Sequence, residues 1–94
     1  MYDIDTSEII LDCKKIKSIT KFYDEISKRF DTPDYFGRNL DALYDILCEM
    51  SEIKIVLRNT GKLKKNLNEY ADSIITVFKD AAVENKKLIL EIEE

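Results

Sequence analysis

The stretch Ile53-Lys54-Ile55-Val56-Leu57-Arg58 decides the fold of this chain, because an apolar run rich in β-branched residues predicts a strand at mid-sequence. Two further short apolar runs lie on either side of it, at residues 8–12 and at residues 88–92. The long segments between these three runs have helical spacing. The predicted order of elements is strand, two helices, strand, two helices, strand.

The segment before the central strand predicts two helices separated by a break at Pro33. Ser18 is a favourable N-cap for the first helix, and Asn39 is a favourable N-cap for the second. The apolar stripes of the two helices are Ile19, Phe22, Tyr23, Ile26 and Phe30, and then Leu40, Leu43, Ile46, Leu47 and Met50.

The segment after the central strand predicts a turn at residues 59–61, a short helix through Leu63 and Leu67, and a longer helix capped by Asn68. The positions of the longer helix expected to face inward are Ala71, Ile74, Ile75, Phe78, Ala81 and Ala82.

Both crossovers are long enough for parallel strand pairing. If both are right-handed and run in one direction, the strand order is 1-2-3 and every helix lies on one face. We therefore expect a two-layer α/β fold, with a three-stranded parallel sheet and about four helices on one face. The length of 94 residues predicts a single domain over 1–94, with residues 1–7 as an N-terminal extension.

One face of this sheet would be open to water, and if Ile53, Ile55 and Leu57 face the helices, Val56 faces out beside Lys54 and Arg58. Ile10 and Ile89 are candidates to join it. Scattered apolar residues are normal on a surface, which is the first interpretation. The second is that the N-terminal Tyr2 and Ile4 cover the face, or that it self-associates.

Residue usage excludes several function classes. The chain has no His, which removes the commonest general base and the Ser-His and Cys-His nucleophile pairs. Cys13 and Cys48 form no CxxC pair, so we expect two reduced thiols, and we expect no metal, no cofactor and no enzymatic activity. The sequence shows no secretory signal and no apolar run long enough for a membrane span, which predicts a cytoplasmic protein.

The formal charge of −4 is concentrated in residues 31–49, which carry five acids and one base, Arg38; the remainder has as many acids as bases. Binding a nucleic-acid backbone needs Lys and Arg, so this segment argues against a direct nucleic-acid partner and favours a cationic one.

The acids of the second helix share one face. Asp41, Asp45 and Glu49 follow one another at i, i+4 and i+8, with Tyr44 on the same side. Like charges at this spacing cost about 0.2–0.5 kcal/mol per pair, so the pattern fits either a solvated face or a binding surface. A row of acids on a helix is a poor cage for Ca²⁺. The cluster Lys62, Lys64 and Lys65 could bind phosphate, but a solvated helix face is the simpler interpretation.

Residues 35–45, Tyr35-Phe36-Gly37-Arg38-Asn39-Leu40-Asp41-Ala42-Leu43-Tyr44-Asp45, resemble the signature of the barstar family of intracellular inhibitors of secreted bacterial ribonucleases. The family pattern is a Pro, an acid, two aromatics, Gly, any residue, Asn-Leu-Asp-Ala-Leu, an aromatic and Asp. Pro33 and Asp34 fit its beginning. A weaker resemblance extends from Ile9 to Ile92, and the family's fold matches the predicted order of elements.

The resemblance implies an antitoxin or immunity protein, monomeric when free, that blocks a small basic ribonuclease with this helix and the loop before it. Asp45 would take the place of an RNA phosphate, and Asp41 would contact the enzyme's basic rim. The other implied contact residues are Tyr35, Gly37, Asn39, Leu40, Tyr44, Glu49, Val77 and Asp80, the last standing where the family has a Glu.

Some positions depart from the family pattern. Tyr44 replaces a Trp, Glu49 stands where the best-known member has Gly, and Met50 stands where it has a second Trp. The alternative is therefore a barstar-like module that binds another basic protein or nuclease toxin.

Overall fold

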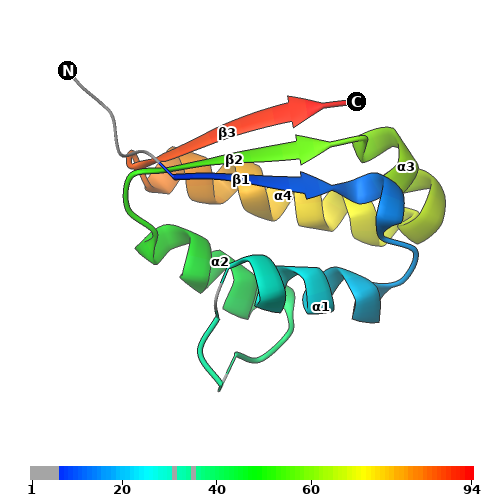
Figure 1. Ribbon diagram of the computed structural model, residues 1–94, viewed down its shortest axis with the longest axis horizontal. Coiled ribbons are helices and arrows are strands. Elements are labelled where there is room, and N and C mark those ends of the chain that lie inside the picture. Colours follow the sequence, from blue (N-terminus) through cyan, green and yellow to red (C-terminus); the bar gives the residue numbers. More distant parts are fainter. Residues whose placement is uncertain (1–6, 31, 35) are drawn as a thin grey trace.

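The computed structural model describes residues 7–30, 32–34 and 36–94 (Figure 1). The strands are β1 (Ser7–Asp12), β2 (Ile53–Arg58) and β3 (Leu88–Glu93). The helices are α1 (Ile19–Arg29), α2 (Leu40–Glu49), α3 (Thr60–Leu67) and α4 (Glu69–Glu84). A short 3-10 helix, η1 (Cys13–Lys15), follows β1 and was not predicted.

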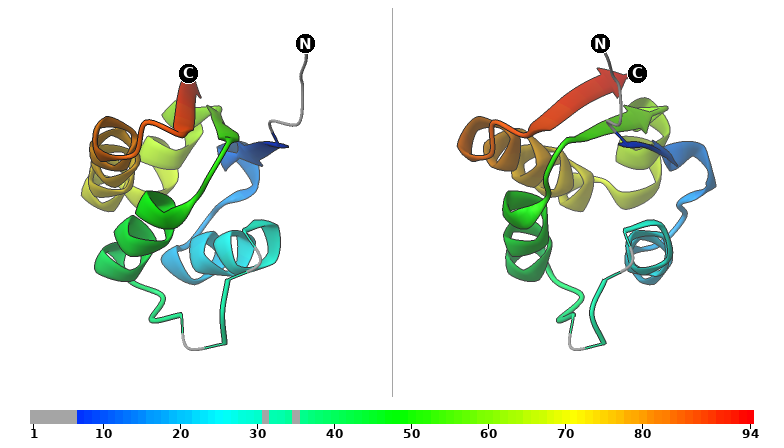
Figure 2. Two further views of the ribbon diagram at one scale, coloured as in Figure 1. Left: turned by 90° about the vertical axis from the view of Figure 1, so that its left-hand side faces the viewer. Right: turned by 60° about the vertical axis from the view of Figure 1, so that its left-hand side comes forward.

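The sheet is parallel and has the order β1-β2-β3, as predicted. Figures 1 and 2 show the helices on one side of the sheet. Each helical crossover is long enough to return the chain to the same end of the sheet, and two crossovers that run in one direction place their helices on the same side. The predicted two-layer α/β class is thus confirmed.

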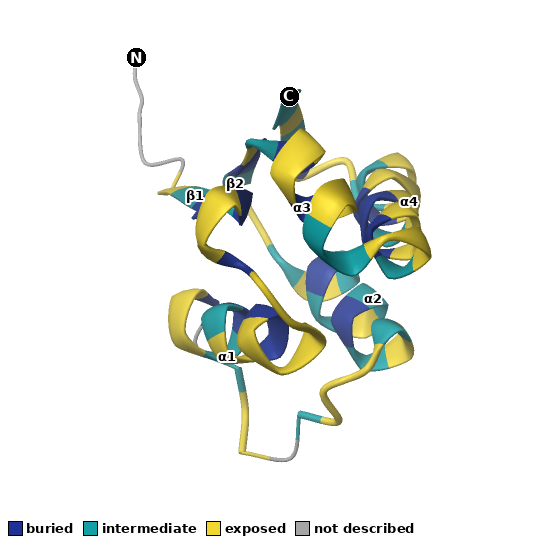
Figure 3. Cartoon of the chain, turned by 90° about the vertical axis from the view of Figure 1, so that its right-hand side faces the viewer, coloured by how far each residue is buried: buried dark blue, intermediate teal, exposed yellow. Residues whose placement is uncertain are grey.

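The alternation of side chains along the strands gives the sheet an inner and an outer face. The inner rows are Ile9–Ile55–Leu90 and Leu11–Leu57–Ile92. These residues belong to the buried core or pack against it. The helices contribute the fully buried side chains of Phe22, Ile26, Leu43, Leu47, Ile74 and Phe78. Figure 3 shows the buried parts of the helices (dark blue) turned toward the interior of the molecule.

Val56 lies on the outer face as expected, beside Ile10 and Glu91, but its side chain is buried there and is only 2% exposed. Lys54 lies on the same face of β2, two residues before Val56. The Lys54 ammonium lies 3.7 Å from Glu8 on β1 and 3.3 Å from Glu91 on β3. Such cross-strand pairs hold the long stems of charged residues over the central strand, where they cover apolar surface.

Two other apolar positions on the outer face differ in exposure. Ile10 is half-buried and Ile89 is 55% exposed. The described residues thus show scattered apolar side chains on this face. Tyr2 and Ile4, which the sequence suggested as a cover, lie outside the described residues.

Ser7, expected in an N-terminal extension, begins β1 and donates its amide to the Glu52 carbonyl.

The predicted caps of α1 and α2 are confirmed. The Lys21 amide donates to Ser18 Oγ at 3.1 Å, and the Ala42 amide donates to Asn39 Oδ1 at 2.8 Å. Each bond satisfies a backbone donor that has no partner within its helix.

The predicted boundaries of α3 and α4 were partly wrong. The expected turn at residues 59–61 gives way to a helix that begins at Thr60, preceded by Asn59 at φ 62°. Asn68 makes no side-chain cap, since it joins α3 to α4 as a single residue at φ 55°. Asn tolerates a positive φ better than most residues. The backbone of Asn68 links the two helices instead, donating to the Lys64 carbonyl and accepting from the Ala71 amide.

Both cysteines are free thiols, and they lie in different environments. Cys13 is fully buried at the start of η1, while Cys48 on α2 is half-buried. Burial raises the pKa of the Cys13 thiol to about 12, helped by the charge of Asp12. The thiolate form is thus strongly disfavoured in the folded protein.

We expect the free energy of unfolding to fall as the pH rises from about 9 toward 12, in part because of Cys13. The unfolded chain releases this proton near the ordinary pKa of 9.0, but the folded chain releases it only near 12. The unfolded state therefore holds fewer protons in this window, so stability is lost as pH rises. Urea unfolding at several pH values measures the effect.

The control is a comparison of Cys13→Ala with Cys48→Ala. Burial and the hydrogen bond with Tyr70 also raise the pKa of Tyr23, and this contribution is present in both variants. Cys13→Ala should have a shallower loss of stability with pH than Cys48→Ala. An equally steep loss in the two variants would contradict the assignment to Cys13.

Candidate partner-binding surface

Helix α2 presents opposite faces to the core and to solvent. Leu43 and Leu47 are completely buried on its inner side. Asp41, Asp45 and Glu49 are exposed on its outer side, one turn apart. The predicted row of carboxylates is therefore present along one face.

The carboxylates of α2 have no cation beside them. Over residues 7–30, 32–34 and 36–94, no Lys or Arg lies within 4.0 Å of a carboxylate oxygen of Asp41, Asp45 or Glu49. Many other acids are paired: the ion pairs join Arg29 to Glu25, Arg38 to Asp24, Lys54 to Glu8 and Glu91, Arg58 to Glu93, and Lys64 to Asp72. The negative field of α2 is thus directed outward, where a cationic partner would meet it.

Both ends of α2 are held in place by side chains. At its C-terminal end, Asn85 Nδ2 donates to the carbonyls of Leu47 (2.9 Å) and Met50 (2.7 Å). Asn85 lies in the connection between α4 and β3, so these bonds tie the end of α2 to a distant part of the chain. Sequence reasoning missed this role, because nothing in the local pattern links residue 85 to residues 47 and 50.

The loop before α2 is attached to α1 through Arg38. Its guanidinium donates to the Asp24 carboxylate at 2.8 Å and to the Thr20 carbonyl at 3.2 Å. The backbone of Arg38 has φ 54°, a conformation that is uncommon for a side chain of this size. Pairing with Asp24 also neutralises the one basic side chain of residues 31–49.

Gly37 occupies a position where the loop approaches the cap of α2. A Cβ atom at this residue would lie 3.0 Å from Asn39 Nδ2 and 3.5 Å from the Ala42 Cβ. Asn39 Nδ2 also donates to the Gly37 carbonyl at 3.3 Å. The absence of a side chain at Gly37 therefore leaves room for the cap.

Helix α4 adds two more carboxylates beside α2. A shallow depression of about 320 Å³ is lined by Tyr44, Asp80, Val83 and Glu84. The pKa of Tyr44 is raised, first by the neighbouring Cys48 thiol, then by burial and by the charges of Glu84 and Asp80. Its hydroxyl is thus a neutral donor at physiological pH. Glu84 was missed by sequence reasoning, although it follows Asp80 by one helical turn.

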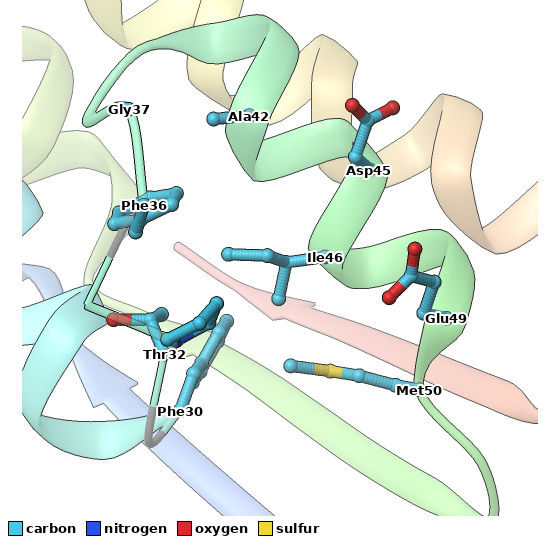
Figure 4. A pocket seen from close by; sticks show the side chains of 10 residues that line it. Phe30, Thr32, Phe36, Gly37, Ala42, Asp45, Ile46, Glu49 and Met50 are labelled. Carbon is cyan, nitrogen blue, oxygen red and sulfur yellow. The ribbon is translucent and has the colours of Figure 1, made fainter.

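A second, larger pocket of about 460 Å³ lies between the C-terminal end of α1, the loop and α2 (Figure 4). Its lining residues are Phe30, Thr32, Pro33, Phe36, Gly37, Ala42, Asp45, Ile46, Glu49 and Met50. In Figure 4, Ile46 and Met50 extend from α2 toward the side of Phe36 and Phe30. Asp45 and Glu49 line the same pocket from the solvent side of the helix.

The remaining predicted contact residues have mixed exposure. Asn39 and Asp80 are exposed, whereas Leu40 and Val77 are half-buried and pack partly against the core. Tyr35 lies outside the described residues. The structure therefore brings the carboxylates of α2 and α4 onto neighbouring surface, and directs Leu40 and Val77 partly inward.

Metal-binding clusters and membrane-spanning helices are both absent from the part of the chain that the structure describes. No group of three His, Cys, Asp or Glu side chains is placed there to hold a metal ion. No helix there is long and apolar enough to cross a membrane. The acidic surface remains the feature with the clearest chemical preference, which is for cationic groups.

Comparison with known proteins adds two findings. A family model described as "Barstar (barnase inhibitor)" matches residues 6–93. A Bacillus subtilis (strain 168) protein named "Putative ribonuclease inhibitor YrdF" is 36% identical over 89 residues, which cover 89% of this chain and 98% of that protein. The family match spans every helix and strand described above.

Proposed function

Because the chain belongs to the barstar family, we propose that it is a protein inhibitor of a small cationic ribonuclease and has no catalytic activity of its own. Helix α2 and the loop before it occlude the active site of the enzyme. As expected from the sequence, we propose that the protein is cytoplasmic and is a monomer when free. Its role would be immunity toward the ribonuclease.

The observation that carries this proposal is the set of unpaired carboxylates on the surface formed by α2 and α4. In the described residues, several carboxylates on these two helices have no cation within 4.0 Å, among them Asp41, Asp45, Glu49, Asp80 and Glu84. Like charges along a helix destabilise the free protein slightly. Binding to a cationic partner would account for this arrangement, because the cations of the partner would remove the repulsion between the carboxylates.

The mechanism is replacement of RNA phosphates by carboxylates. A ribonuclease holds its substrate with basic groups, because every phosphodiester carries a negative charge. Asp45, in the middle of α2, would occupy a phosphate position, and Asp41 and Asp80 would contact the basic rim. Tyr35, Gly37, Asn39, Leu40, Tyr44, Glu49 and Val77 complete the proposed contact surface.

The free protein supports this mechanism by holding the surface in a fixed shape. Arg38 ties the loop to α1, and Asn85 ties the end of α2 to the α4–β3 connection. A surface that is already ordered loses less conformational entropy when it binds. Rigid presentation therefore adds to affinity without adding any contact.

An inhibition assay tests the proposal. The chain is titrated into a panel of small basic ribonucleases, barnase included, and hydrolysis of a fluorogenic RNA is followed at 0.1 M and 1 M salt. We expect stoichiometric inhibition of at least one enzyme. Association should slow strongly with salt, because the screening length falls from about 10 Å to about 3 Å over this range.

Two outcomes would contradict the proposal. The first is that no basic ribonuclease is inhibited at low salt. The second is an association rate that stays flat between 0.1 M and 1 M salt, since this would argue against electrostatic steering.

A second candidate is a module that binds another basic protein, such as a nuclease toxin of a different fold. The features that favour it are Glu49 and Asp80, which depart from the family pattern on the proposed contact surface. Binding to such a toxin, combined with no effect on any ribonuclease, would select this function.

A further inference from the structure

The larger pocket beside α2 combines an apolar lining with two acidic residues. Its apolar part is formed by Phe30, Phe36, Ile46 and Met50, and its volume of about 460 Å³ lies within the usual range of ligand pockets, about 300–1,000 Å³. Asp45 and Glu49 also line the pocket, and Figure 4 shows their carboxylates at its edge, turned away from Phe36 and Phe30. An occupant that satisfies both parts must be apolar along its length and cationic at its end.

We propose that this pocket receives an arginine side chain of the cationic partner, and that Glu49 is a specificity-determining residue for it. The inference rests on the proposed function for the identity of the partner. The aliphatic part of the arginine would lie against Ile46 and Met50. Its guanidinium would lie between the carboxylates of Asp45 and Glu49.

Arginine fits this pocket better than lysine or histidine. A guanidinium is planar and weakly hydrated, and it packs on aromatic faces such as that of Phe36. Its several donors can reach two carboxylates at once, whereas an ammonium acts as a single charge. Neither Asp45 nor Glu49 has a cation within 4.0 Å among the described residues.

The spacing of the two carboxylates strengthens the argument. Asp45 and Glu49 are separated by one helical turn, so in the free protein they repel each other slightly. A cation placed between them removes this repulsion and attracts both charges. The pocket therefore selects a cation more strongly than one carboxylate would.

The experiment uses the full chain and a small probe, so that it does not depend on the ribonuclease. The probe is N-butylguanidinium, and the neutral comparison is N-butylurea, which has the same shape without the charge. Methyl NMR signals of Ile46 and Met50 are followed during titration at low salt. We expect saturable shifts with the guanidinium in the millimolar range, and no saturable shift with the urea.

The matched variants are Glu49→Gln and Asp41→Asn, which each remove one negative charge from α2. Of the two substituted residues, Glu49 lines the pocket and Asp41 does not. We expect Glu49→Gln to weaken binding of the probe about fivefold, as a lost charge at about 4 Å in water would. Asp41→Asn should change it less than twofold.

The inference is overturned if the urea binds as well as the guanidinium, if Ile46 and Met50 do not respond, or if both variants weaken binding equally. Inhibition of a ribonuclease by the same preparation would then leave the proposed function standing. Saturable binding of the probe without inhibition of any ribonuclease would instead keep the arginine pocket and assign it to another basic protein.

Discussion

Replacing Asp45 with alanine should weaken inhibition of the ribonuclease by about 30-fold to several thousand-fold, which corresponds to about 2–5 kcal/mol. This is the general range for truncating one partner of a buried interfacial charge pair, a class for which barnase and barstar are the standard example. The physical reason is that cationic groups of the enzyme would remain buried without a partner. Enzyme inhibition and titration calorimetry measure the loss.

The same substitution should leave the free protein almost unchanged. Asp45 is exposed in the middle of α2, and no Lys or Arg of the described residues lies within 4.0 Å of its carboxylate. Removing it also relieves repulsion with Asp41 and Glu49, about 0.2–0.5 kcal/mol per pair. Thermal melts should therefore place the variant within about 1 kcal/mol of the parent, or slightly above it.

Two variants serve as comparisons. Asp80→Ala removes a carboxylate on α4, nearer the rim of the proposed surface, and should cost less than Asp45→Ala. Lys64→Ala removes an exposed charge that pairs with Asp72 at 3.6 Å, and should change inhibition very little. If Asp45→Ala inhibits as well as the parent while Lys64→Ala does not, the proposed surface is the wrong one.

Phe78→Ala should lower the free energy of unfolding by about 3–5 kcal/mol. Phe78 is completely buried on α4, and its ring meets that of Phe30 edge to face, with centroids 6.5 Å apart. Truncation removes apolar burial and leaves a cavity between α4 and the end of α1. Stability of a small domain is about 5–15 kcal/mol, so this loss is a large part of the total.

Urea unfolding measures this effect, with two comparison variants. Phe78→Leu keeps most of the volume and should cost less than about 1.5 kcal/mol. Val83→Ala, at a position that is 66% exposed on the same helix, should stay within about 0.5 kcal/mol. A loss below about 1 kcal/mol for Phe78→Ala would show that the core relaxes around this position. Phe30 also lines the larger pocket, so Phe78→Ala should in addition weaken N-butylguanidinium binding.

The order of strands and helices could be predicted because each element carries its own local signal. Ser18 and Asn39 cap their helices as expected, since capping involves residues only three positions apart. The link between α3 and α4 could not be predicted, because the role of Asn68 depends on a positive φ that composition does not specify. The burial of Val56 could not be predicted, because its neighbours across the sheet, Ile10 and Glu91, belong to strands far away in the sequence.

In the candidate site too, some features could be predicted from the sequence and others could not. The carboxylates of α2 are visible in the sequence, because a regular helix brings every fourth residue onto one face. Glu84 and the pocket next to Phe36 are produced by packing between separate helices and a loop. The role of Asn85 depends on carbonyl groups more than thirty residues away. None of these long-range contacts leaves a periodic pattern in the chain.

The strand register also has a consequence for how the molecule folds. Ser7 pairs with Ile53, and Ile53 pairs with Leu88, so neither strand pairing is a local hairpin. Closing a long loop lowers the entropy of the chain before the stabilising contacts between strands can form. Such topologies are therefore slow to fold. During synthesis the central strand lacks one neighbour until β3 has been made. The chain should therefore gain its final structure, and with it any inhibitory capacity, only after β3 has been synthesised.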